Sequence, residues 1–164
     1  MTSIYDSIEK IASDFRKKAE ELIGFDDNVS DFLKRLVEAL HGSITIVQNP
    51  EIYEMQGGSL TIQPDGSFNI NLPPQTSPLR DNFTIAHELG HYLLHYEKKD
   101  ETQIFTRYGA NDQEYQANRF AAAFLMPKDR FKDALSKFNK SSLLIAAEFQ
   151  VSEQAVITRM GYIN

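Results

Sequence analysis

The stretch that decides the fold is FTIAHELGHYLLHY, residues 83–96, which sets an H-E-x-x-H pattern inside an otherwise apolar run. On an α-helix each residue turns by about 100°, so His87 and His91 share one face and lie roughly 6 Å apart along the axis. Two imidazoles at this spacing can bind one metal ion, and Glu88 can face that ion without ligating it. We therefore expect a mostly buried helix that carries two metal ligands, with Glu88 as a general base acting on a water that the metal activates.

Length and composition restrict the class of protein. A chain of 164 residues, 41% hydrophobic and 24% charged, predicts one globular domain, or one domain with a small appendage. Because the chain has no cysteine, any zinc site must use histidine and carboxylate ligands, and a cytoplasmic location is expected. Residues 1–18 lack the pattern of a signal peptide, and no apolar run could cross a membrane. The net charge of −6 argues against nucleic acid as the main partner, because phosphate attraction needs a basic surface.

The segments before the metal helix alternate between two periodicities. Apolar residues at helical spacing predict helices over residues 4–23 and from Ser30 to Gly42, which we interpret as core cover. The period then changes to two, which predicts strands at residues 44–47, 59–62 and 67–72. The fold class is therefore α+β, with a small, mostly antiparallel sheet packed against the metal helix and further helices. The last strand is either an ordinary member of this sheet or an edge for an extended substrate.

The segments after the metal helix include a second marked helix. The metal helix itself is expected to start at Ser77-Pro78, an N-cap followed by proline. Polar residues 97–111 form a long connection, suited to a lid, a binding loop or simple mobility. Residues 112–126, DQEYQANRFAAAFLM, then predict a helix that ends before Pro127. Its face with Glu114, Ala117, Asn118 and Ala121 is small enough to approach another backbone closely.

A catalytic zinc ion needs three protein ligands and one open position for water, so a third ligand must follow the two histidines. His95 lies on the same helix about 12 Å from His87 along the axis, which is too far for both to reach one ion. We interpret His95 as a core or rim histidine. Asp112 remains an alternative, but Glu114 is favoured because its helix can pack closely against the metal helix.

The C-terminal segment, residues 128–164, is expected to form a unit packed on a core of residues 1–127. It predicts a short helix at 128–138 and a pair of helices at 142–149 and 152–160 with the rhythm of a helix-turn-helix. Gln150 stands where such turns often have glycine, and the second helix offers little besides Arg159 for DNA contact. We therefore favour packing or partner binding over DNA reading for this pair.

The two marked helices together resemble a known family. HELGHYLLH followed by EYQANRFAAAFLMP is similar to the ImmA/IrrE-type zinc metallopeptidases, in which an H-E-x-x-H helix is paired with a downstream E-x-x-A-N helix. The resemblance implies a zincin-like core and zinc bound by His87, His91 and Glu114. It also suggests that Asn118, one turn beyond the third ligand, orients a metal-bound histidine by a hydrogen bond.

The function expected from this resemblance is a zinc-dependent endopeptidase in which Glu88 transfers the proton of the attacking water to the leaving amine. A second donor to the oxyanion is expected, with Tyr92, Tyr96, Tyr108 and His95 as candidates. Similar proteins are anti-repressors, so the implied partner is a helix-turn-helix transcriptional repressor that is cleaved at one site. The alternative is a non-catalytic anti-repressor, or a component of a toxin–antitoxin type of system, that sequesters its partner.

Overall fold

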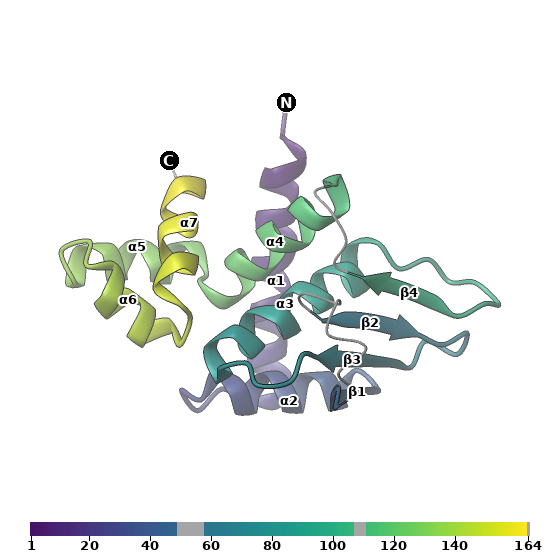
Figure 1. Ribbon diagram of the computed structural model, residues 1–164. Coiled ribbons are helices and arrows are strands. Elements are labelled where there is room, and N and C mark those ends of the chain that lie inside the picture. The colour runs from purple at the N-terminus through teal and green to yellow at the C-terminus, as the bar shows by residue number, and fades with distance from the viewer. Residues whose placement is uncertain (49–57, 107–110, 164) are drawn as a thin grey trace.

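The computed structural model describes residues 1–48, 58–106 and 111–163 of the chain (Figure 1). The fold is α+β, as predicted. Figure 1 shows the sheet at one end of the molecule and the last three helices at the other, with α1, α3 and α4 between them. Along the chain, the described elements are α1 (Ile4–Ile23), α2 (Val29–Ala39), β1 (Gly42–Ile46), β2 (Ser59–Ile62), β3 (Phe68–Leu72), α3 (Pro78–Leu94), β4 (Gln103–Thr106), α4 (Asp112–Leu125), α5 (Lys128–Lys137), α6 (Ser142–Phe149) and α7 (Glu153–Tyr162).

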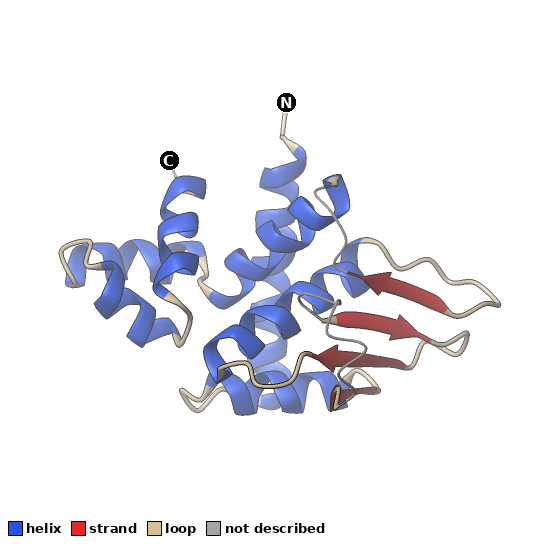
Figure 2. Ribbon diagram, viewed as in Figure 1, coloured by secondary structure: helices blue, strands red, loops and turns tan. Residues whose placement is uncertain are grey.

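The sheet is mixed but mostly antiparallel, and its strand order is β1-β3-β2-β4 (Figure 2). β1 pairs with β3 in parallel, whereas β2 pairs antiparallel with both β3 and β4. Leu60 of β2 lies opposite Ile70 on one side and Phe105 on the other. The suggestion that β3 forms an edge was wrong, because β3 lies between β1 and β2. Among the described strands, the outer ones are β1 and β4.

Strand β4 lies inside the segment that was predicted to be an irregular connection. Its four residues, Gln103–Thr106, contain only two large apolar side chains, and Ile104 is 65% exposed. The strand is therefore defined by its pairing with β2 and not by a local pattern, since strand formation depends strongly on neighbouring strands. The long polar connection is in fact interrupted by a piece of the sheet.

The helix ends follow local capping chemistry. The hydroxyl of Ser77 accepts the N–H of Arg80 at the start of α3, and Pro78 occupies its first turn, as predicted. The start of α2 was predicted two residues late, because the Asn28 side chain, not Ser30, accepts the N–H of Asp31. Asparagine is as good an N-cap as serine, so the sequence offered two acceptable starts.

Helix α4 is the central element of the core. From Phe120 to Met126 its residues are at most 2% exposed, and Phe15 of α1 packs against the rings of Phe120 and Phe124. On its other side α4 approaches α3 very closely: a Cβ added to Gly90 would lie 3.2 Å from the Cα and the carbonyl oxygen of Ala117. The predicted close approach of the small face of α4 is confirmed, and it uses a residue without a side chain on α3.

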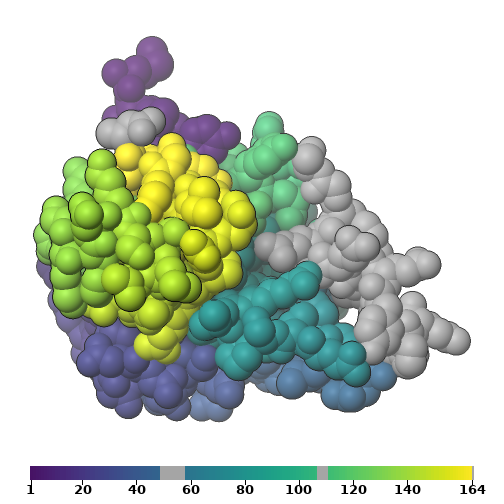
Figure 3. Space-filling view, turned by 60° about the vertical axis from the view of Figure 1, so that its left-hand side comes forward, coloured from purple at the N-terminus to yellow at the C-terminus, as the bar shows by residue number. Residues whose placement is uncertain are grey.

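The C-terminal helices α5, α6 and α7 form one continuous face of the molecule (Figure 3). Gln150 adopts the left-handed conformation at the turn between α6 and α7, with φ 55° and ψ 46°, where glycine is common. Its side-chain oxygen accepts the N–H of Val29 at the start of α2, at 3.1 Å, so this turn is attached to the core. The division at residue 127 stays a prediction. Among the described helices, none combines the length and the apolar character that a bilayer span requires.

Arg159 of α7 does not reach the surface. Its side chain is 0% exposed, its Nε donates to the carbonyl oxygen of Met126 at 3.0 Å, and its guanidinium forms a two-point ion pair with Glu9 of α1. The residue that we considered for DNA contact therefore joins the two ends of the chain and is not available to a nucleic acid.

Candidate metal centre

Three side chains from two helices converge at one buried point. His87 and His91 come from α3 and Glu114 from α4, and one potential ligand atom from each lies within 4.8 Å of the others. The two Nε2 atoms are 3.2 Å apart, and the carboxylate oxygens of Glu114 lie 3.1 Å from His87 Nε2 and 2.8 Å from His91 Nε2. The three residues are 0%, 2% and 7% exposed, respectively. The structure thus brings together the residues that were predicted to bind zinc.

The local structure of α4 explains why Glu114 reaches the histidines. Asn111 caps the helix, and its side-chain oxygen accepts the N–H of Glu114 at 2.9 Å. Glu114 therefore lies in the first turn, where the positive end of the helix dipole stabilises a carboxylate. The contact of Gly90 with Ala117, three residues further along α4, sets the short distance between the helices. Asp112, the alternative ligand, is exposed in the same turn and is not part of the cluster.

Asn118 fixes the proton position on His87. Its Oδ1 lies 2.8 Å from His87 Nδ1, and an amide oxygen can only accept a hydrogen bond, so Nδ1 carries the proton. In the neutral ring, Nε2 then presents its lone pair to the cluster. The hydrogen bond between His87 and Asn118 that was suggested by the family resemblance is therefore present, with Asn118 as the acceptor.

The protonation states of the other two groups also suit a cation. Burial lowers the pKa of His91 from 6.5 to about 4, and the nearby His87 acts in the same direction. Burial acts to raise the pKa of Glu114, whereas hydrogen bonds and charge from His87 and His91, when a proton lies on their Nε2 atoms, act to hold that pKa below its usual value. At neutral pH, His91 is therefore neutral and Glu114 is ionised, which are the forms that bind metal.

The chemistry of the three groups fits a divalent metal ion. Two imidazole lone pairs and a carboxylate converge on one point, and such acceptor atoms repel one another unless a cation or a proton lies between them. Two histidines and one glutamate are also the ligand set of a recognised class of catalytic zinc sites, which leave a fourth position open. Among the described residues, no second group of three such side chains was found. His87, His91 and Glu114 can therefore hold a zinc ion.

The remaining predicted residues lie around this cluster. Glu88 is 1% exposed and precedes the turn of α3 that carries His91. The rings of Tyr92 and Tyr96 stack, and Tyr92 packs against Phe68 of β3, on the side of the sheet. Tyr108 lies outside the described residues. Neither tyrosine belongs to the cluster of His87, His91 and Glu114.

Two features beside the cluster were missed by sequence reasoning. His95 is half-buried, which agrees with its interpretation as a core or rim histidine, but its hydrogen bond to His91 through their Nδ1 atoms, at 2.9 Å, was not predicted. Its position four residues after His91 was the available signal, since residues at this spacing meet on a helix. The second feature is β4, whose Phe105 ring stacks on the His91 ring at 5.2 Å. An outer strand of the sheet therefore runs beside the cluster.

Comparisons with known proteins agree with this picture. The family model of the IrrE N-terminal-like domain, Peptidase M78, matches residues 53–160. A solved structure named as a Mycobacterium tuberculosis transcriptional regulator superposes with a TM-score of 0.68 and 18% sequence identity. That match covers 94% of this chain but only 47% of the other, so the present chain spans about half of that protein. At this identity the likeness supports the fold alone. A search of curated proteins found no match.

Proposed function

This chain belongs to the IrrE N-terminal-like family, Peptidase M78, and from that premise we propose that it is a zinc-dependent endopeptidase. The observation that carries the proposal is the buried convergence of His87 Nε2, His91 Nε2 and the Glu114 carboxylate. We assign these three residues as zinc ligands and Glu88 as the general base. The family match supports a metallopeptidase, and the ligand set supports zinc as its ion.

The chemistry follows from the positions of these groups. Zinc bound at this site would supply Lewis-acid polarisation of the scissile carbonyl and of the attacking water. Glu88, next to His87 on α3, accepts the proton of that water and delivers it to the leaving amine. Asn118 holds the His87 ring in the form whose Nε2 lone pair faces the cluster. The buried setting strengthens each of these electrostatic contributions, because less water screens them.

We further propose that the substrate lies along β4. This outer strand pairs with β2 on one side, and Phe105 places it directly beside His91. An extended peptide can add to such an edge through main-chain hydrogen bonds. The peptide would then cross the centre with its scissile bond near the ligands. By resemblance to the ImmA/IrrE-type peptidases, we propose that this peptide belongs to a helix-turn-helix transcriptional repressor, cleaved at one site.

The test is to mix the purified, zinc-loaded protein with a helix-turn-helix repressor encoded beside it and to analyse the products by mass spectrometry. We expect one discrete cut. The matched variant is Glu88→Gln, which keeps the shape of the side chain but cannot accept the proton. It should retain zinc and lose about 10²- to 10⁴-fold in cleavage rate, the usual contribution of a general base.

The same variant distinguishes the alternative function. A protein that only sequesters its repressor would leave that repressor intact, and the Glu88→Gln variant would bind the repressor as well as the wild type does. Undiminished cleavage by this variant would instead contradict the assignment of Glu88. A repressor that is neither cut nor bound would exclude that substrate.

A further inference from the structure

Two successive hydrogen bonds connect His91, the second zinc ligand in our proposal, to His95 and then to Gln116. His91 Nδ1 lies 2.9 Å from His95 Nδ1, and His95 Nε2 lies 2.8 Å from Gln116 Oε1. His95 is the residue that ends α3, and Gln116 lies on α4 between Glu114 and Asn118. The chain therefore begins at the metal centre, leaves α3 at its C-terminal end and finishes on the helix that supplies the third ligand.

The direction of each hydrogen bond follows from the last member of the chain. The amide oxygen of Gln116 has no proton, so Nε2 of His95 must donate to it. A neutral His95 then has only a lone pair at Nδ1, and the Nδ1 of His91 must donate to that atom. A neutral His91 in turn has only a lone pair at Nε2, the atom that faces His87 and Glu114. When a metal ion lies between His91 Nε2 and the Glu114 carboxylate, the Gln116 acceptor on α4 thus determines the tautomers of both rings.

We propose that His95 and Gln116 are positioning residues that hold His91 in the tautomer and orientation needed to bind the metal ion. This inference rests on the proposed zinc centre. It assigns a role to the third histidine of HELGHYLLH, which is too far along the helix to be a ligand itself. It also gives the two metal-binding histidines equivalent support from α4: Asn118 contacts His87 directly, and Gln116 contacts His91 through His95.

The geometry of the ring contacts agrees with a positioning role. The His91 ring contacts Phe105, stacked at 5.2 Å and 20°, and His95, at 5.0 Å and 51°. The stacked Phe105 limits tilting of the His91 ring, but a ring flipped by 180° about the Cβ–Cγ bond would lie in the same plane. The hydrogen bond from Nδ1 to His95 restricts that flip. A ligand ring must keep its nitrogen within about 0.2 Å of the ideal metal distance, so this restriction affects affinity.

The experiment measures zinc affinity, by competition with a chromogenic chelator, in the full chain and in four variants. His95→Phe keeps an aromatic ring but removes the acceptor, and we expect zinc binding to weaken by about 10- to 100-fold, as is typical for such partners. Gln116→Leu removes the last acceptor and should weaken binding less. Gln116→Glu keeps an acceptor oxygen and should bind at least as well as the wild type. The control is Gln113→Leu, an exposed position on the same helix, which should change nothing.

A second measurement separates positioning from general packing. In the zinc-loaded protein, where the ion occupies the position between His91 Nε2 and Glu114, long-range ¹H–¹⁵N NMR spectra report which ring nitrogen of each histidine carries the proton. We expect Nδ1–H for His91 and Nε2–H for His95 in the wild type and in Gln116→Glu, and a mixture of tautomers in Gln116→Leu. Thermal unfolding of the metal-free variants would show any loss of packing separately.

The outcomes distinguish this inference from the proposed function. If the wild type binds zinc and His95→Phe and Gln116→Leu bind it as tightly as the Gln113→Leu control, the positioning role is overturned while the zinc centre stands. If the wild type itself binds no zinc, the zinc centre and the positioning role are both overturned. Weaker zinc binding by His95→Phe and Gln116→Leu, unimpaired binding by Gln116→Glu and a change of tautomer in Gln116→Leu would together support the proposal.

Discussion

The two ends of α4 both carry buried polar groups, but these groups are arranged in opposite ways. At the N-terminal end, Glu114 meets His87 and His91, and three acceptor groups converge on one point. At the C-terminal end, the carbonyl oxygens of Phe124 and Met126 accept hydrogen bonds from two buried arginines. Carbonyls in the last turn of a helix have no partner within the helix, so donors from elsewhere in the chain stabilise them. The difference teaches that burial of charge does not by itself indicate a site; the balance of donors and acceptors does.

At the C-terminal end of α4, called the arginine end below, the two buried arginines have hydrogen-bond acceptors as partners. Arg16 of α1 donates to Phe124 and to Glu20, and Arg159 of α7 donates to Met126 and forms two hydrogen bonds with Glu9. Each guanidinium thus has both a carbonyl and a carboxylate partner. Groups that satisfy one another in this way contribute to the structure and have no need of a ligand.

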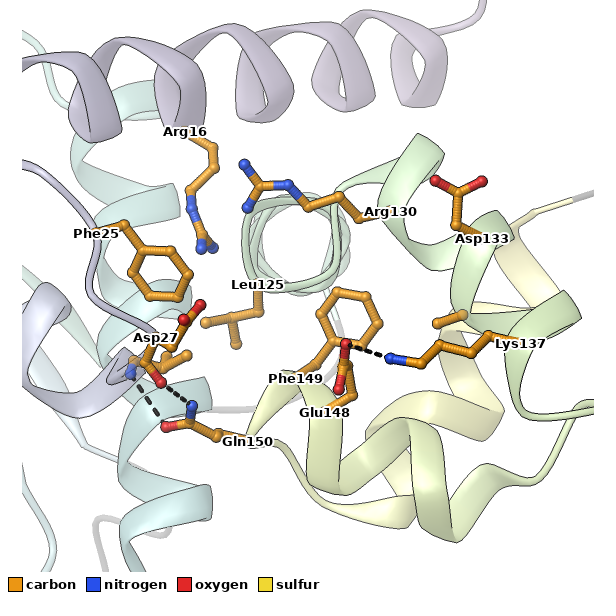
Figure 4. A pocket seen from close by; sticks show the side chains of 12 residues that line it. Arg16, Phe25, Asp27, Leu125, Arg130, Asp133, Lys137, Glu148, Phe149 and Gln150 are labelled. Atoms are coloured by element: carbon orange, nitrogen blue, oxygen red, sulfur yellow. Dashed lines mark hydrogen bonds and ion pairs between the residues drawn. The ribbon is translucent and has the colours of Figure 1, made fainter.

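The same criterion applies to the cavity of about 680 Å³ beside this end of α4, between α1 and the helices α5 and α6 (Figure 4). Three cationic side chains line it, and each has an acidic partner. Arg16 and Arg130 both bind Glu20, and Lys137 lies 3.5 Å from Glu148. The cationic side chains of the cavity are therefore already paired with carboxylates. We therefore assign function to the acceptor-rich cluster.

The largest expected effect concerns the N-terminal end of α4, called the metal end below, where Glu114 meets His87 and His91. Replacing Glu114 by glutamine removes the one charged ligand, and zinc affinity should fall by about 10²- to 10³-fold, because three or four ligands share a total binding energy of roughly 10 kcal/mol or more. The stability of the metal-free protein should not fall, because removing the charge of Glu114 relieves the repulsion among the acceptors. The measurement is chelator competition for zinc, with denaturant unfolding of the metal-free protein as the control. Zinc affinity equal to that of the wild type would contradict the assignment of Glu114 as a zinc ligand.

The next effect tests the arginine end. Arg159→Met keeps an unbranched side chain but leaves Glu9 and the Met126 carbonyl without their partner. Breaking a buried ion pair costs about 3–5 kcal/mol, and because Glu9 is 19% exposed we expect the lower part of that range in unfolding free energy. Zinc affinity should not change.

The matched control for this variant is Lys10→Met, which breaks an ion pair to Asp14 on the exposed side of α1. An exposed pair contributes little to stability, because water and salt screen it, so this variant should unfold nearly as the wild type does. If Arg159→Met lost zinc affinity and kept its stability, the assignment of the C-terminal end of α4 to stability, and not to metal binding, would be wrong.

The metal end was largely predictable from the sequence because its signals are local. The spacing of His87 and His91 on one helix, and the small side chains around Glu114 on another, follow from helix geometry alone. The structure brings these residues together as expected. The local pattern did not predict the hydrogen-bond partners of His95. A helical wheel gives the face on which His95 lies, but it does not show which side chains its ring contacts.

The arginine end could not be predicted, for a corresponding physical reason. Arg159 and Glu9 are 150 positions apart in the chain, and nothing near either residue indicates the other. The sequence of its own helix predicts that Arg159 is a surface cation able to contact DNA, whereas tertiary packing buries it completely. Strand β4 was missed for the same reason, because its hydrogen-bond partner, β2, lies about forty residues earlier in the sequence.

A smaller effect is expected when only the distance between α3 and α4 is changed. Gly90→Ala gains about 1 kcal/mol of helix propensity, but its Cβ would lie 3.2 Å from the backbone of Ala117, so α4 must move by a few tenths of an ångström. Net stability should change by less than about 1 kcal/mol, because the two contributions oppose each other. Glu114 moves with α4, so zinc affinity should fall by several-fold, about 1 kcal/mol.

The control for this variant is Gly161→Ala on α7, where a Cβ would meet nothing within 4 Å. It should gain up to about 1 kcal/mol in unfolding free energy and leave zinc affinity unchanged. If Gly90→Ala behaved in the same way, the close contact between α3 and α4 would not determine the geometry of the ligands.

The smallest expected effect concerns acid, and it falls on the arginine end. Burial acts to raise the pKa of Glu20, but hydrogen bonds and charge from Arg130 and Arg16 outweigh it, so the pKa in the folded protein lies below the usual 4.5. A group of this kind stabilises the fold fully above its unfolded pKa and loses that contribution as the pH falls through its folded pKa. The wild type should therefore exceed Glu20→Gln in unfolding free energy, by about 1 kcal/mol at pH 7, and the difference should shrink as the pH falls below about 4.5. Denaturant unfolding of both proteins between pH 7 and pH 3 measures it. A difference that is independent of pH would mean that the charge of Glu20 does not contribute to stability, and that Arg16 depends on its contact with the Phe124 carbonyl instead.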